Sequence, residues 1–179
     1  MEVTLKDIRP LIWRRFLVPA NITFYKLHQV LQIVMGWGGY HLFGFYIDKN
    51  ILISIPDPTA PFFKCLNAKR KKLNEYFEKE GDKIRYLYDF GDSWEHEIKL
   101  KKILSVDQRM KHPVCIKGER GCPPEDCGGT GGYEDLLEII MDPEHEEYEE
   151  KTCWLGDNFD TEGFDIDVIN AILKKVKFR

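Results

Sequence analysis

The 179-residue chain contains no apolar run long enough to cross a bilayer as a helix. Residues 1–7 have neither the basic segment nor the apolar segment of a secretory signal, so no signal peptide is expected there. The five cysteines are an odd number, whereas a secreted disulfide scaffold normally pairs all of its cysteines. These absences predict a cytoplasmic protein with reduced thiols that does not associate with a membrane.

Signatures of nucleophilic catalysis and of nucleotide binding are also missing. Ser54, Ser93 and Ser105 are the only serines, and none stands in a Gly-x-Ser-x-Gly turn. The triplet Asp-Phe-Gly at 89–91 occurs in protein kinases, but no glycine-rich loop and no His-Arg-Asp loop accompany it. The sequence therefore assigns no catalytic residue and no cofactor, and it leaves open whether the chain is an enzyme.

The chain does have enough apolar material for a hydrophobic core without disulfides, with 43% hydrophobic and 13% aromatic residues. Its length favours a single domain that spans residues 1–179. A net charge of -4 exerts no general attraction on nucleic acid, so a nucleic-acid partner would need a local basic patch. Arg14-Arg15 and Lys69 to Lys72 are candidates for such a patch, and the acidic tract Glu144 to Glu150 balances them.

The first half of the chain alternates strand patterns with one clear helix. Thr23 is expected to cap this helix, and Gly36 is expected to end it. The other elements expected in this half are a strand around Val3 and Leu5, a turn at Arg9-Pro10, strands over Ile12 to Val18, His41 to Ile47 and Ile51 to Ile55, a proline-rich loop over 56–61, and a short helix capped by Asn74.

A second hairpin is predicted where aromatic residues alternate with polar ones after residue 83. A three-residue loop, Gly91 to Ser93, would pair Phe90 with Trp94 and Tyr88 with His96, and this register produces a coherent buried face. It also places His96 in the core, Asp89 on the opposite face and Asp92 in the turn.

Asp89, Asp92 and His96 therefore have two interpretations. They can form a polar site, including a site for a metal ion. Alternatively, the aspartates stabilise a tight turn through bonds to the backbone, and His96 is a core residue.

The last third is predicted to be helical. The expected helices are one with apolar positions from Tyr133 to Ile140, an acidic one from Asp142-Pro143 to Glu150, and a final one capped by Asp165. The whole pattern predicts an α+β fold in which helices pack on an antiparallel sheet built from hairpins.

Cys115, Cys122 and Cys127 could bind zinc together with a histidine, because zinc takes thiolates and imidazoles in tetrahedral sets. Two prolines stiffen the five-residue spacing from Cys122 to Cys127, and no second cysteine pair follows. Buried thiols are the alternative.

Gly128, Gly129, Gly131 and Gly132 come just before the helix predicted around Tyr133. Backbone amides at such a position can hold an anion. The alternative is a flexible loop that leads into the helix, because no Gly-Lys-Ser/Thr sequence follows.

Several unusual segments follow one another along most of the chain. They are Arg9-Pro10, Ile12 to Arg15, Leu27-His28, Met35 to Trp37, His41-Leu42 with Phe45, Tyr86 to Asp92 with Trp94 and His96, Cys122 to Asp126, Gly128-Gly129, Gly132-Tyr133, Trp154, and Phe164 to Leu173. Together they resemble the plasmid pRiA4b ORF-3-like family, which is related to passenger proteins of insertion elements. The resemblance implies an α+β fold and a connection with mobile elements, and it implies no activity, cofactor or catalytic residue. Phe43 stands where the resemblance leads us to expect a second histidine after His41, which argues against a metal site formed by that pair.

Two hypotheses for function follow. The first is a binding or accessory module with a polar cleft between the Asp92 turn and the loop from Cys122 to Tyr133, which recognises nucleic acid, a protein or an anionic ligand. Its candidate ligand-binding residues are Asp89, Asp92, Trp94, His96, Glu125, Asp126, Gly128, Gly129 and Tyr133. The second is a metal-dependent enzyme that uses Asp89, Asp92, His96, Glu125 and Asp126. Further candidate metal ligands are His41, His96, Cys115, Cys122 and Cys127.

Overall fold

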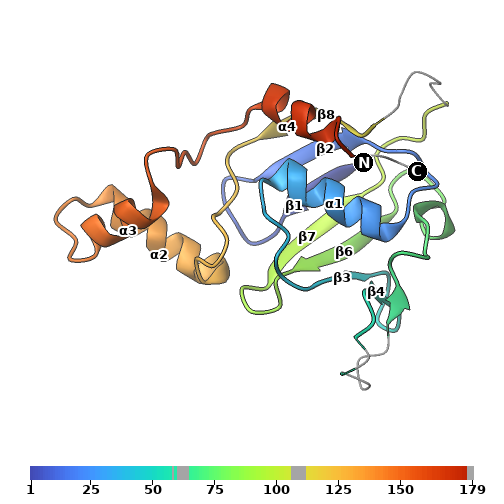
Figure 1. Cartoon of the computed structure of the whole chain (residues 1–179), viewed down its shortest axis with the longest axis horizontal. Helices are drawn as coiled ribbons and strands as arrows, with labels where there is room; N and C mark the ends of the chain where they lie inside the picture. The colour runs from blue at the N-terminus through green and yellow to red at the C-terminus, as the bar shows by residue number, and fades with distance from the viewer. Residues whose placement is uncertain (58, 60–64, 106–111, 177–179) are drawn as a thin grey trace.

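The computed structural model describes residues 1–57, 59, 65–105 and 112–176. It contains one eight-stranded sheet in the order β5-β4-β3-β6-β7-β1-β2-β8 (Figure 1), antiparallel except for the parallel pair β4–β5. The strands are β1 Glu2–Leu5, β2 Trp13–Leu17, β3 Phe43–Tyr46, β4 Leu52–Ser54, β5 Leu66–Asn67, β6 Lys83–Tyr88, β7 Trp94–Lys99 and β8 Val114–Glu119. The helices are α1 Phe24–Met35, α2 Gly129–Met141, α3 Tyr148–Leu155, α4 Ile166–Leu173 and the short 3-10 helix η1 Leu73–Glu75. The α+β prediction is confirmed.

The core lies between one face of the sheet and helix α1, which crosses in front of the strands in Figure 1. Alternate strand residues point into it, and Val3, Phe16, Tyr86 and Ile98 are completely buried. Helix α4 packs beside α1 and against β8. Among the described residues, no helix combines the length and the apolar character that crossing a membrane requires.

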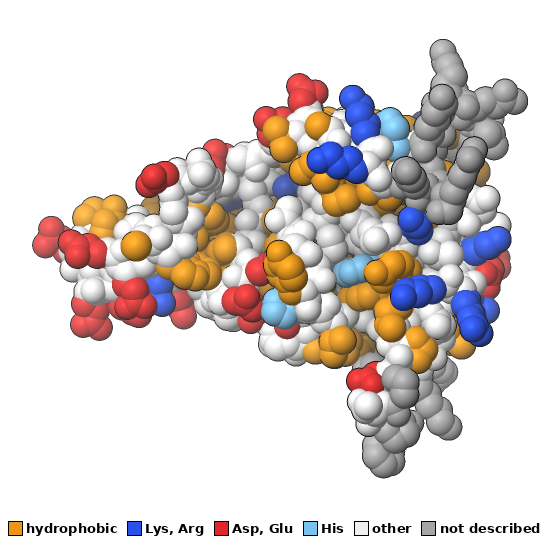
Figure 2. Space-filling view, viewed as in Figure 1, with side chains coloured by type: hydrophobic (Ala, Val, Ile, Leu, Met, Phe, Trp, Pro, Cys, Tyr) orange, Lys and Arg blue, Asp and Glu red, His pale blue; other side chains and the backbone are white. Residues whose placement is uncertain are grey.

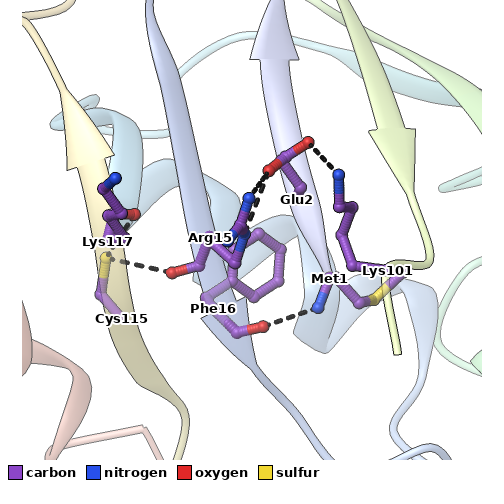
Figure 3. Close-up of polar contacts among 7 residues, drawn as sticks. All are labelled: Met1, Glu2, Arg15, Phe16, Lys101, Cys115 and Lys117. Carbon is purple, nitrogen blue, oxygen red and sulfur yellow. Dashed lines mark hydrogen bonds and ion pairs between the residues drawn. The ribbon is translucent and has the colours of Figure 1, made fainter. Parts of the chain in front are cut away.

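The other face of the sheet carries charged side chains joined in ion pairs. Glu2 on β1 accepts from Arg15 at 2.6 Å and lies 3.2 Å from the Lys101 ammonium (Figure 3). The Met1 amino group donates to the carbonyl of Phe16 at 2.8 Å, and burial lowers the pKa of this amine to about 6. These contacts tie β1 to β2 and to the segment that follows β7.

Arg14 has the opposite environment from its neighbour Arg15, because it is only 2% exposed. Its guanidinium donates to the carbonyls of Val34 at 2.8 Å, Glu119 at 2.6 Å and Arg120 at 2.5 Å. It also stacks over the Phe164 ring, 4.5 Å from the ring centroid. Arg14 is therefore a structural residue, and it is not available to contact phosphates.

Sequence periodicity correctly predicted helix α1 and its two ends. The Thr23 hydroxyl accepts from the amide of Lys26 at 3.3 Å. Gly36 has a φ of +86°, and its amide donates to the carbonyl of Gln32 at 2.9 Å. Left-handed backbone of this kind favours glycine, which explains why the helix ends there. The cap at Asp165 is also confirmed, because its carboxylate accepts from the amides of Asp167 and Val168.

The predicted register of the β6–β7 hairpin is wrong by two residues. Tyr88 pairs with Trp94, and Tyr86 pairs with His96, so the loop has five residues, 89–93. Two of these, Asp89 and Ser93, have positive φ values of +55° and +58°. A change of two residues keeps every side chain on its own face. The buried face is therefore as predicted for the residues within the strands, but Asp89 and Phe90 lie in the turn and not on a strand face.

Other boundaries differ from the prediction for local reasons. The Asp142 carboxylate accepts from the amide of Glu144 at 3.1 Å, forming a turn that competes with a helix start. Helix α3 consequently begins at Tyr148, not at Pro143. The cap of η1 is Lys72 and not Asn74, which lies inside this element. The proline-rich loop predicted for 56–61 falls in part outside the described residues.

Strand β8 was not predicted, because its mixed sequence does not alternate clearly. It pairs with β2 at the edge of the sheet, with a shift in register between Arg15 and Phe16. Three of the glycines expected before helix α2 lie within its first turn, and Gly128 is its N-cap.

Candidate functional site

Three connecting segments meet at one end of the sheet. They are the loop 37–42 after α1, the turn 89–93 between β6 and β7, and the loop 122–128 before α2. The amide of Asp89 donates to the carbonyl of Leu42 at 2.9 Å. The amide of Gly38 donates to Glu125 at 2.7 Å, and the amide of Gly128 donates to Asp92 at 3.2 Å. Segments that are far apart in sequence are thus held together by hydrogen bonds that backbone amides donate to a carbonyl and to two carboxylates.

His41 lies between two carboxylates in this region. Its Nδ1 is 3.6 Å from Asp89 Oδ2, and its Nε2 is 3.2 Å from Asp126 Oδ1. One potential metal-ligating atom from each of the three residues lies within 4.8 Å of those of the other two. Among the described residues, no other group of three His, Cys, Asp or Glu side chains has this geometry. The Asp89 side chain is nearly buried, whereas that of Asp126 is 72% exposed. We call these three residues the His41 cluster.

The turn fixes the orientation of the Asp89 carboxylate. Its Oδ1 accepts from the amide of Gly91 at 2.8 Å, and its backbone carbonyl accepts from the amide of Ser93 at 2.7 Å. The backbone of the turn therefore engages one carboxylate oxygen, and the other oxygen is directed toward His41. The turn role of Asp89 and its place in a polar cluster are thus compatible.

His41 Nε2 is shielded from solvent and makes no hydrogen bond within the described structure. Asp126 approaches it within ion-pair distance but without the alignment of a hydrogen bond. A shielded nitrogen without a hydrogen bond is uncommon, because desolvated polar atoms are normally paired. The nitrogen and the two carboxylates together form an N/O donor set.

A second layer of contacts supports the cluster. The Tyr88 hydroxyl donates to Glu125 Oε1, and burial together with this hydrogen bond raises the pKa of Tyr88. The Trp37 ring stacks on Tyr88 at 5.0 Å, and its indole N–H donates to the carbonyl of Pro123 at 2.9 Å. Aromatic residues of the sheet and of the loop after α1 therefore anchor the segment that carries Asp126.

Gly129 allows the turn and α2 to approach each other closely. Its φ is +70°, and a Cβ atom at this position would lie 2.3 Å from the carbonyl oxygen of Asp92. Replacing Gly129 by alanine is expected to lower the free energy of unfolding by at least about 1–2 kcal/mol, the cost of left-handed backbone alone. In Gly131→Ala the new Cβ meets no atom within 4 Å, so this variant is expected to gain about 0.5–1 kcal/mol in the same helix. Urea unfolding of both variants checks the prediction, and a change of the same sign in both would contradict it.

The remaining candidate residues are distributed as follows. Asp92 lies in the turn, and Glu125 has both carboxylate oxygens engaged, by Tyr88 and by Gly38. Trp94, His96 and Tyr133 are buried in the core. The Nδ1 of His96 lies 3.0 Å from the carbonyl of Trp94, and burial lowers the pKa of its imidazole to about 4. His96 is thus a core residue and is not part of the His41 cluster.

None of the three cysteine candidates belongs to the His41 cluster, although Cys127 directly follows Asp126. Cys115 lies on β8, where its thiol contacts the carbonyl of Arg15 at 3.6 Å. Cys122 contacts Arg14 at 3.4 Å, and burial raises the pKa of its thiol to about 11. Burial also raises the pKa of Cys127, to about 12. Thiols in such surroundings stay protonated at neutral pH, and zinc binds the thiolate form.

Sequence reasoning had placed Asp89 and Asp126 in one candidate metal-binding set and His41 in another, and had not grouped the three. No local spacing connects them, because 48 and 85 residues separate His41 from its two partners. The pairing of Tyr88 with Glu125 was also missed, since Tyr88 was interpreted only as an apolar strand residue.

Comparison with known proteins gives three consistent matches. The sequence profile of the plasmid pRiA4b ORF-3-like proteins matches residues 1–168. The uncharacterized protein y4hQ of Sinorhizobium fredii (strain NBRC 101917 / NGR234) is 36% identical over 160 residues, which are 87% of this chain and 79% of that protein. The crystal structure of MM3350 from Methanosarcina mazei Go1, a protein of unknown function, is similar with a TM-score of 0.81 and 41% identity over 93% of both chains.

Proposed function

The chain belongs to the plasmid pRiA4b ORF-3-like family, and the two relatives above are an uncharacterized protein and a protein of unknown function. We therefore propose a function from the site itself: a binding module that holds a divalent transition-metal ion at the His41 cluster. The observation that carries this proposal is the meeting of an imidazole and two carboxylates from three segments, with their donor atoms within 4.8 Å of one another.

The donor set favours zinc or manganese over calcium. Imidazole nitrogen is a preferred ligand of zinc, and carboxylate oxygen is accepted by zinc and preferred by manganese. Calcium takes six to eight oxygens, a number that a cluster of one nitrogen and two carboxylates does not supply. Three protein ligands would leave a coordination position for water or for a partner molecule.

The test is metal binding by the chelator-stripped chain, measured by isothermal titration calorimetry with Zn²⁺, Mn²⁺ and Ca²⁺. We expect one Zn²⁺ or Mn²⁺ ion per chain and at least about tenfold weaker binding by Asp126→Asn, which is the loss typical of disturbing a metal site. Asp126 is a suitable target because its side chain is largely exposed, so the variant should fold.

The matched control is Asp135→Asn, which removes one exposed carboxylate from α2, outside the cluster. Its affinity is expected to equal that of the unmodified chain. Absence of Zn²⁺ and Mn²⁺ binding, or equal losses in both variants, would overturn the proposal.

A metal-dependent enzyme is the alternative function, and the surroundings of the cluster favour it less. Such an enzyme needs a general base next to the metal-bound water. Glu125 is engaged through both of its oxygens, and His96 is buried in the core. The binding module therefore remains the function that these contacts support best.

A further inference from the structure

Charge is divided between two parts of the molecule. Residues 134–162, which include most of α2 and all of α3, contain twelve carboxylates and one lysine, and so contribute -11 to the total charge of -4. The remaining residues therefore sum to +7. Figure 2 shows the acidic side chains gathered on the part that projects at the left, residues 134–162, which we call the acidic arm. Most lysines and arginines lie at the right, on the rest of the molecule, which we call the body. The mildly acidic composition of the whole chain conceals this separation.

Six cations gather on the body around the start of α1 and the end of α4. We call this group the basic patch, and its members are Lys26, Lys69, Arg70, Lys72, Lys174 and Lys175. All except the half-buried Lys26 are exposed. Among the described residues, none of the five exposed cations forms a direct ion pair with a carboxylate, whereas the neighbouring Lys71 is paired with Glu75 at 3.1 Å.

Backbone contacts bring the three segments of the patch together. The amide of Tyr25 on α1 donates to the carbonyl of Ala68 at 3.0 Å, and the amide of Phe24 donates to the carbonyl of Lys71 at 2.9 Å. The Lys69 ammonium lies 5.0 Å from the centroid of the Tyr25 ring. Lys26 and Lys175 line opposite sides of a shallow hollow between α1 and α4. The three segments of the patch are thus neighbours on the surface.

We propose that the basic patch binds the phosphate backbone of duplex nucleic acid, at a place separate from the His41 cluster. The five exposed cations of the patch, which form no ion pair within the described part of the chain, fit a regular array of phosphates. The aromatic ring within the patch, Tyr25, is half-buried and covered by Lys69, so it offers no free platform on which unpaired bases would stack. Contacts to phosphates carry no sequence information, and binding is therefore independent of sequence.

The acidic arm gives such a complex its orientation. Its carboxylates are repelled by phosphates, so α2 and α3 point away from the nucleic acid while the body faces it. The arm would then remain accessible to other molecules.

The test is fluorescence anisotropy of a labelled 20-base-pair DNA of arbitrary sequence with the full chain, in EDTA and from 50 to 300 mM NaCl. The chelator makes the result independent of the metal proposal. Phosphate contacts from the five exposed cations predict that log Kobs falls with log[salt] with a slope of about -4.5. The variant Lys69→Gln/Arg70→Gln/Lys72→Gln should reduce the slope to about -2, because two of these contacts remain.

The matched control, Lys49→Gln/Lys83→Gln/Arg85→Gln, removes three cations near the opposite face of the sheet. It should retain the slope of the unmodified chain. No binding at 50 mM NaCl, or equal losses in both triple variants, would overturn the proposal. Binding to vesicles that contain phosphatidylserine, without binding to DNA, would overturn it in favour of a membrane surface. Salt-sensitive self-association without DNA binding would overturn it in favour of the acidic arm of a second copy.

Discussion

Replacing Arg14 by methionine is expected to lower the free energy of unfolding by at least about 3 kcal/mol, because several buried or half-buried carbonyls lose their donor at once and each costs about 1–3 kcal/mol. The guanidinium joins the end of α1, through Val34, to the residues that end and follow β8, through Glu119 and Arg120. Methionine has nearly the same length but no donor. The loss should therefore come mainly from the polar contacts.

The neighbouring Arg15 provides the control for this prediction. It lies on the solvent side of β2, where it pairs with Glu2. Surface ion pairs contribute about 0–1 kcal/mol, so Arg15→Met should change stability by less than about 1 kcal/mol. Urea unfolding at pH 7.5 measures both variants. Equal effects at the two positions would show that the Arg14 network does not stabilise the fold as the structure indicates.

Stability is expected to fall steeply as the pH is lowered from 6.5 to 4, because two histidines are buried as neutral imidazoles. Burial lowers the pKa of His28 to about 4, and that of His96 to about 4. Between these values and the ordinary pKa of about 6.5, the unfolded chain binds two protons that the folded chain does not. The contribution of the two histidines is therefore complete well above pH 6.5, and its loss approaches about 2.7 kcal/mol per pH unit within the window.

The contacts of His28 explain why it resists protonation. Its Nδ1 lies 2.8 Å from the Tyr86 hydroxyl, which also accepts from Gln32 at 2.9 Å. Because the Tyr86 hydroxyl accepts from the Gln32 amide, it donates its own hydrogen to His28 Nδ1. Protonation of Nδ1 would remove the acceptor of this hydrogen bond. The Phe43 ring stacks on His28 at 3.7 Å and excludes water.

The measurement is a series of urea unfolding curves from pH 8 to pH 4. The Met1 amine, with its pKa of about 6, lowers stability in the same direction between pH 8 and pH 6, so the histidine slope is read below pH 6. His145→Asn replaces a histidine that is only half-buried and lies outside the core, so it should leave the slope unchanged. Stability that is constant between pH 6 and pH 4.5 would contradict the prediction.

Periodicity in the sequence identified α1, the hairpins and the core, since these depend on which face of an element is apolar. It did not determine the length of the turn after Tyr88, because loops of three and five residues bury the same faces. The turn is specified by backbone bonds to Asp89, which the pattern of apolar residues does not report. The His41 cluster could not be predicted from the sequence for a related reason, because its members meet only through the tertiary arrangement of three loops.

The central position of β1 in the sheet has a consequence for how the chain folds. Its first partner, β2, follows at once, but Val3 on its other side pairs with Ile98, about 95 residues further along the chain. Contacts at such sequence separation raise the contact order and slow folding. During synthesis one edge of β1 stays unpaired until β7 has been made, and in that interval the nascent chain is most exposed to aggregation.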